Sequence, residues 1–215
     1  INDIPIERVQ HVKIIGLIVD EQLNFSQHIQ HVKNKINPFV AKFFHIRRFI
    51  SETTALKLYY AHVYSHLIFM NSIWSVAPKY LIESLGVIQR RALRTVYMKD
   101  RLCHNVELFN ENVLPLSAVI TFHENLILFK MLNNLLKNNI PLIQANAIHF
   151  HNTRRNQHLI SYNTNTALAQ NNFYFRSVRS FNALPNYVKT FNSIGLFKKR
   201  LKEYLADTAA NTELI

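Results

Sequence analysis

The sequence predicts a mainly α-helical protein that begins with a short β-hairpin. The 215 residues include only 3 Gly and 6 Pro, too few for a turn-rich all-β protein. Hydrophobic residues make up 48% of the chain and charged residues 18%, a composition typical of folded globular proteins. Several long segments place apolar residues three and four positions apart, which is the period of a helix that buries one face.

The first 25 residues are expected to form strands. Residues 12–19 are an almost continuous apolar run rich in β-branched side chains, which is typical of a buried strand. Residues 4–6 are expected to pair with this run as a hairpin around the polar segment 7–11. Two strands alone are only marginally stable in water, so we expect them to join a sheet that lies upstream.

Residues 26–50 are predicted to form an amphipathic helix, with Pro38 kinking or splitting it. One face of this helix is apolar: Ile29, Val32, Ile36, Phe39, Phe43, Ile46 and Ile50. A row of basic and imidazole side chains runs beside it: His28, His31, Lys35, Lys42 and His45. Spacings of three, four and seven keep each set on one face.

Three further helices are expected before residue 140. The second covers residues 51–77, with Ser51 as N-cap and a buried seam of Leu56, Tyr59, Val63, Leu67, Met70 and Trp74. The third covers residues 79–98 and turns Leu81, Leu85, Ile88, Ala92 and Val96 inward and Arg90, Arg91 and Arg94 outward. The fourth opens at Pro115 and ends near residues 138–139.

The C-terminal part is expected to combine a polar loop with one basic helix. Residues 142–175 are rich in Asn and Thr and only weakly periodic, so loop and short extended pieces are predicted. Ser193 is expected to cap a helix that docks through Phe197, Leu201 and Leu205. Residues 206–215 are expected to form a frayed tail.

Residues 58–78 carry no formal charge and have about the length of a membrane span. Because this segment contains two His, an Asn and three Ser, a buried core helix is the preferred interpretation, and no membrane partner is expected. The single cysteine, Cys103, excludes a disulfide framework and favours an intracellular reducing compartment. A chain that begins at Ile1 is expected to be a piece of a longer protein.

The charge balance points to a polyanionic partner. There are 25 Lys and Arg against 13 Asp and Glu, a formal net charge of +12. Nucleic acid is the favoured partner, and a basic surface without any partner is the alternative. The candidate nucleic-acid-binding residues are His28, His31, Lys35, Lys42, Arg47, Arg48, Arg90, Arg91 and Arg94. Basic rows of this kind contact phosphates without reading sequence.

Catalytic and metal-binding patterns are weak. The chain has no Asp-Asp pair, and Asp20 is read as a turn or cap residue. His28 and His31 share a helix face, and His149 and His151 are further ligand candidates, but no carboxylate or thiolate is placed to complete the site. No catalytic residue, metal site or cofactor is therefore assigned to this chain.

One stretch has the residue order Lys13-x-x-Gly16-x-x-x-Asp20-x-x-Leu23-x-Phe25-x-x-His28-Ile29-x-x-Val32-x-x-Lys35. This order resembles the end of the reverse transcriptase domain of non-LTR (LINE-like) retrotransposons. In that family a Lys-aromatic-Leu-Gly strand closes the palm before the thumb begins. The chain departs from the family at Ile14-Ile15, where an aromatic-Leu pair is usual, and at Phe25, where Trp is common.

Later segments are similar to the same family in the same order. They are Leu58-Tyr59-Tyr60-Ala61, Trp74, Gln89-Arg90-Arg91-Ala92-Leu93-Arg94, Asn152-Thr153-Arg154, Phe181-Asn182-Ala183-Leu184-Pro185 and Phe197-Lys198-Lys199-Arg200-Leu201. The resemblance implies four regions. These are the last palm strands (1–25), a helical thumb-like region (26–100), a mainly helical C-terminal region (101–205) and a tail (206–215).

The resemblance implies a function in RNA-directed DNA synthesis. The chain would be the part of a polymerase that grips the RNA–DNA hybrid, without the catalytic aspartates. Its partners would be RNA, DNA and the upstream palm and fingers of the same polyprotein, with magnesium at the missing palm and a nuclear location. The alternative is a stand-alone or degenerate helical protein that binds nucleic acid or another partner without enzymatic activity.

Overall fold

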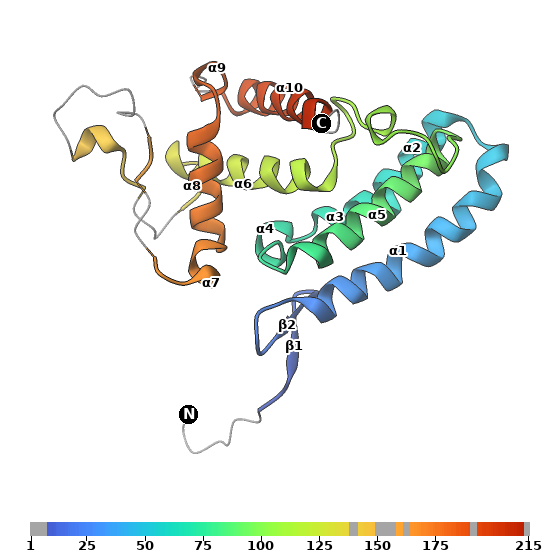
Figure 1. Ribbon diagram of the computed structural model, residues 1–215, viewed down its shortest axis with the longest axis horizontal. Helices are drawn as coiled ribbons and strands as arrows, with labels where there is room; N and C mark the ends of the chain where they lie inside the picture. The colour runs from blue at the N-terminus through green and yellow to red at the C-terminus, as the bar shows by residue number, and fades with distance from the viewer. Residues whose placement is uncertain (1–7, 138–141, 149–157, 161–163, 190–192, 213–215) are drawn as a thin grey trace. The chain divides into compact units, whose positions relative to one another are not determined.

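The computed structural model describes residues 8–137, 142–148, 158–160, 164–189 and 193–212. It confirms the predicted fold class, since the protein is mainly helical and begins with a two-stranded antiparallel hairpin (Figure 1). The chain divides into two compact units, Ile1–Cys103 (unit 1) and His104–Ile215 (unit 2). The sequence had placed this boundary between residues 100 and 101.

Unit 1 contains the hairpin and five α-helices within its described residues. The strands are β1 (His11–Ile14) and β2 (Leu17–Asp20), and the helices are α1 (Ser26–Ile46), α2 (Glu52–Tyr59), α3 (Ser65–Ile68), α4 (Asn71–Trp74) and α5 (Lys79–Val96). A 3-10 turn, Arg47–Phe49, follows α1, and a π-helical turn, Tyr60–Tyr64, joins α2 to α3. The hairpin packs on α1, and α1 packs on α5 and on the segment from the π-helical turn to α3.

The predicted single strand over 12–19 is wrong, because the chain reverses in the middle of it. β1 pairs with β2 in a register that places Ile14 opposite Leu17. The turn is formed by Ile15 and Gly16, both at positive φ. β1 is exposed along its whole length, whereas Leu17 and Asp20 of β2 are buried. The predicted partner strand, residues 4–6, lies outside the described residues.

Helix α1 forms as predicted over most of its length. It is followed by the 3-10 turn and runs through Pro38 without being split. Its core face consists of Ile29, Val32, Ile36, Val40 and Phe43, all at most 5% exposed. Phe39, Ile46 and Ile50 were predicted to belong to this face, but Ile46 is exposed and the other two are half-buried.

The predicted helix over 51–77 is broken into three. Ser51 caps α2 as expected, because its Oγ accepts a hydrogen bond from the Thr54 N–H at 3.2 Å. Met70 then adopts a left-handed conformation that ends the regular helix before α4. The seam is nevertheless core, with Tyr59, Val63, Leu67 and Trp74 each at most 1% exposed. None of the described helices is both long and apolar enough to cross a membrane.

Unit 2 is built around three longer helices. Its helices are α6 (Leu116–Leu132), α7 (Ala167–Gln170), α8 (Phe173–Ala183), α9 (Asn186–Lys189) and α10 (Ile194–Thr212), with 3-10 turns at Asn105–Leu108 and Ala145–Ala147. α6 packs against both α8 and α10. The rings of Phe129 and Phe197 stack with centroids 4.0 Å apart. Glu124 of α6 is buried and forms an ion pair with Arg176 of α8.

Two helix boundaries in unit 2 differ from the prediction. α6 ends at Leu132, because Asn134 adopts the left-handed conformation that closes a helix and the Leu135 N–H bonds back to the Lys130 carbonyl at 2.8 Å. α8 begins at Phe173, inside the predicted loop, since the Asn172 side chain caps it. The docking of Phe197, Leu201 and Leu205 is confirmed.

The predicted tail over residues 206–215 is helical through Thr212. Ala206, Ala209 and Ala210 line a small recess together with Val106 and Phe109, so this last part of α10 borders the segment that precedes α6. Small alanine side chains gave a weak hydrophobic signal in the sequence, although they suit a helix that lies close to another segment.

We expect Gly16→Ala to destabilise the protein by about 1–3 kcal/mol. Gly16 has φ +90°, and an added Cβ would lie 3.3 Å from the Phe69 ring. The matched control is Gly86→Ala, which lies inside α5, where an added Cβ meets only the end of Arg90 at 3.5 Å. The control should be neutral or stabilise by up to about 1 kcal/mol. Urea denaturation measures both, and equal effects would contradict the assignment of the turn.

Candidate nucleic-acid interface

Unit 1 contains a long segment that is almost free of carboxylates. Between residues 22 and 82 the only acidic residue is Glu52. The same segment carries seven Lys and Arg and five His: Lys33, Lys35, Lys42, Arg47, Arg48, Lys57, Lys79, His28, His31, His45, His62 and His66. The surface formed by α1 and the helices after it is therefore strongly cationic, which attracts polyanions.

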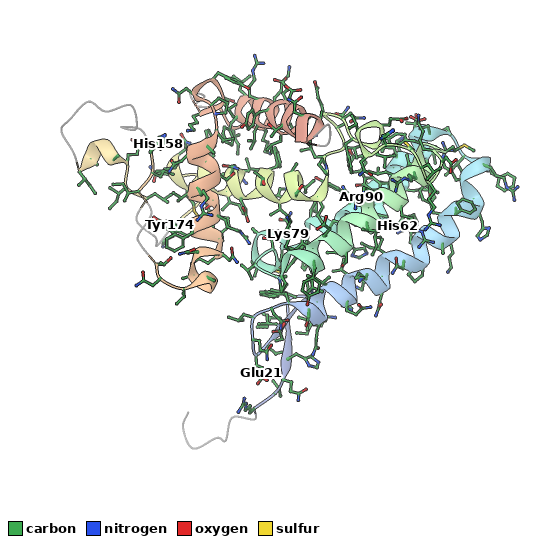
Figure 2. The ribbon with its side chains drawn as sticks, viewed as in Figure 1. Glu21, His62, Lys79, Arg90, His158 and Tyr174 are labelled. Carbon is green, nitrogen blue, oxygen red and sulfur yellow. The ribbon has the colours of Figure 1, made fainter. Side chains whose placement is uncertain are left out.

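The nine predicted binding residues fall into three groups. Lys35, Lys42, Arg48 and Arg91 are exposed. His31, Arg90 and Arg94 are half-buried, with Arg90 labelled on α5 in Figure 2. His28 and Arg47 are buried, so the prediction that they face outward is wrong. Nothing in the described part of the chain forms an ion pair with the amino group of Lys35 or of Lys42.

His28 holds the hairpin against α1. It is 2% exposed, and its Nδ1 accepts a hydrogen bond from the Ile18 N–H of β2 at 3.4 Å. Its ring lies 6.2 Å from that of Trp74, and Nε2 is buried without a partner. Burial, with a smaller contribution from the charge of His31, lowers the pKa of His28 to about 4. The imidazole is therefore neutral at pH 7.

Arg47 fastens the end of α1 to the end of α5. Its Nε donates to the Val96 carbonyl at 2.7 Å and its Nη1 to the Ile50 carbonyl at 2.8 Å. The carbonyls at the end of a helix lack partners within the helix and carry partial negative charge, which suits a guanidinium. Arg94 has a related role, since its Nη2 donates to the Cys103 carbonyl at 3.3 Å. Both side chains are thus engaged with the protein's own backbone.

Three residues that were not predicted belong with the exposed cations: Lys13 of β1, His62 of the π-helical turn and His66 of α3. Together with His31 and Lys35 of α1 they form what we call the imidazole–lysine cluster. Burial, then Lys35 and then Lys13 lower the pKa of His31. Burial, then Lys35, His62 and His31 lower the pKa of His66. His31 and Lys35 are four residues apart on α1, and α1 packs against the segment from the π-helical turn to α3, which carries His62 and His66.

A ring contact between Phe39 of α1 and His62 of the π-helical turn fixes how these two helical segments are aligned. The two rings stack with centroids 4.5 Å apart and an interplanar angle of 21°. His62, labelled in Figure 2, is exposed. His62 and His66 are four residues apart, which places them on one helix face. The sequence shows this spacing, but residues 58–78 as a whole are predicted to form a buried core helix.

The metal-site alternative gains no support from the described residues. Among them, no group of three or more His, Cys, Asp or Glu side chains is placed to hold a metal ion. His28 uses Nδ1 to accept an amide hydrogen, and His149 and His151 lie outside the described residues. Asp20 is a turn residue as predicted, since its Oδ1 accepts from the Asn24 N–H at 3.0 Å.

Comparison of the chain with protein-family models, with curated proteins and with solved structures finds no match. The case for a function therefore depends on the residues themselves and on the resemblance of the motifs.

We expect acid to destabilise the hairpin through His28. A pKa lowered from 6.5 to about 4 means that the unfolded state binds the proton more tightly. The stability is therefore complete above pH 6.5 and is lost as the pH falls towards 4, by on the order of 3 kcal/mol. His28→Asn keeps an acceptor near the position of Nδ1 and should remove this part of the acid dependence. Urea denaturation at several pH values compares the two proteins, and identical pH profiles would contradict the assignment.

Arg47 and Arg48 are adjacent but should behave differently on substitution. Arg47→Met leaves the Val96 carbonyl without its donor and should cost about 2–4 kcal/mol. Arg48 is exposed, with its guanidinium carbon 5.1 Å from the centre of the Phe49 ring, so Arg48→Met should cost no more than about 1 kcal/mol. Denaturation curves measure both, and a larger loss for Arg48→Met would overturn the assignment of Arg47.

Proposed function

We propose that unit 1 binds the sugar–phosphate backbone of nucleic acid. The observation that carries this proposal is the combination of exposed Lys35 and Lys42 with a surrounding segment that has one carboxylate in 61 residues, 22–82. Lysines without carboxylate partners retain their charge for an external anion. Phosphate contacts of this kind hold a duplex of any sequence.

We further propose that the bound nucleic acid is an RNA–DNA hybrid, with the chain as the thumb and C-terminal part of a non-LTR retrotransposon reverse transcriptase. The ordered motifs from Lys13 to Leu201 support this step. A hybrid must slide past the protein during copying, which suits contacts to phosphates and not to bases. Polymerisation requires carboxylates that hold two metal ions, and these belong to the upstream palm in the proposal.

The exposed hairpin supports a partner of that kind. Val12 and Ile14 point to the same side of β1 and are 44% and 51% exposed, and Ile15 at the turn is 80% exposed. Among the described residues β1 pairs only with β2, so its other edge can pair with a further strand. An upstream palm sheet would cover these side chains. Cooperative melting without light scattering would instead favour the stand-alone alternative.

The salt dependence of binding tests the proposed function. The chain should bind a short RNA–DNA hybrid with an affinity that falls steeply as salt rises. Lys35→Gln combined with Lys42→Gln should reduce the slope of log Kd against log salt by up to about 1.8, which is about 0.9 for each lost phosphate contact. Fluorescence anisotropy with a labelled hybrid measures the slope.

The matched control replaces Lys198 and Lys199, two exposed lysines of α10, by Gln. It makes the same change in net charge in unit 2 and should leave the slope nearly unchanged. Failure of the chain to bind the hybrid at low salt, or equal slopes of log Kd against log salt for the two double variants, would contradict the proposal.

A further inference from the structure

We propose that the imidazole–lysine cluster is a phosphodiester-binding site that takes up protons when the anion binds. This inference rests on the proposed function and adds to it the position of the bound phosphate and the pH dependence of the affinity for nucleic acid. The groups involved are Lys13, His31, Lys35, His62 and His66.

The geometry supplies two pairs of nitrogen-bearing side chains on helical segments that pack against each other. His31 and Lys35 are four residues apart on α1, and His62 and His66 are four residues apart on the segment that packs against it. The stack of Phe39 on His62 fixes one segment relative to the other. Lys35 and His62 are exposed, and His31 and His66 are half-buried, so the cluster is open to a ligand.

The imidazoles of His31 and His66 are not occupied in holding the fold. In the described part of the chain neither side chain makes a hydrogen bond. His28 is different, because its Nδ1 accepts an amide hydrogen from β2. The ring nitrogens of His31 and His66 are therefore available to donate to a phosphate oxygen when protonated.

Without an anion, the cluster disfavours its own protonation. Burial lowers the pKa of both His31 and His66, and nearby cations add to the effect. The titratable groups that act on or are acted on by His31 are Lys35, Lys13, His66 and His28, and those that act on His66 are Lys35, His62 and His31. All of them are cationic when protonated, and no carboxylate acts on either imidazole. Without a bound anion, His31 and His66 therefore favour their neutral forms at pH 7.

A bound phosphodiester reverses this balance. Its negative charge offsets the repulsion among the cations and raises the pKa of the imidazoles beside it. Binding then takes up protons, and by linkage the affinity increases as the pH falls. Each proton taken up strengthens binding by up to about tenfold for each unit of pH over the range in which it titrates.

The pH dependence of hybrid binding tests this inference. The wild-type chain should bind a labelled RNA–DNA hybrid at least about fivefold more tightly at about pH 5.5 than at about pH 7.5. The double variant H31Q/H66Q keeps neutral donors at both positions and should lose most of this gain while still binding at about pH 7.5. The range stops near pH 5.5 because His28 destabilises the hairpin in stronger acid.

The control variant is His45→Gln. His45 is exposed near the end of α1 and does not contribute to the pKa of His31 or of His66. It should retain the full pH dependence. If His45→Gln loses as much of the dependence as H31Q/H66Q, or if H31Q/H66Q keeps it, the inference is wrong while the proposed function stands. Absence of binding at every pH would overturn both.

NMR titration of the wild-type imidazoles gives a second readout that does not depend on a variant folding. The hybrid should raise the pKa of His31 and of His66. Inorganic phosphate added alone is the comparison. A rise with inorganic phosphate and none with the hybrid would identify a free-anion site and overturn the phosphodiester assignment.

Discussion

Unit 1 depends on the burial of one face of α1. Ile29, Ile36 and Phe43 are at most 1% exposed, and the helix packs against α5 and against the segment from the π-helical turn to α3. A helix buried along one stripe must present its remaining residues to the surface or at the edge of the contact. The exposure of Lys35 and Lys42 is a direct consequence, since they lie beside the buried stripe and not within it.

The same packing divides the polar residues of α1 and of the 3-10 turn that follows it between two roles. His28 and Arg47 lie at the two ends of the buried face and satisfy backbone groups, an amide of β2 in one case and a carbonyl of α5 in the other. Buried polar groups in proteins are nearly always paired in this way, because an unpaired one is costly. Between these ends, His31 and Lys35 remain at the edge of the contact with the segment that carries His62 and His66. A row that looks uniform in sequence therefore combines structural residues with candidate ligands.

Unit 2 is also organised by the burial of a helix. α6 has few charges and packs against two helices, so it buries both apolar side chains and polar ones. Glu124 is balanced by Arg176, and the Asn125 side-chain amide donates to Ser180 Oγ at 2.7 Å and to the Thr121 carbonyl at 2.8 Å. These contacts define how α6 and α8 fit together.

The sequence by itself determined the helical class, most of the core residues of α1 and α5, the docking residues of α10 and the surplus of positive charge, because period and composition are local properties. The exposure of Lys35, Lys42, Arg48 and Arg91 also followed from it. Tertiary structure decided the reversal at Gly16, the break at Met70, the burial of His28 and Arg47, and the meeting of His31 with His66. Each of these features depends either on contacts between residues distant in sequence or on a backbone conformation that packing stabilises. The spacing of residues within a single segment encodes neither the contacts nor the conformation.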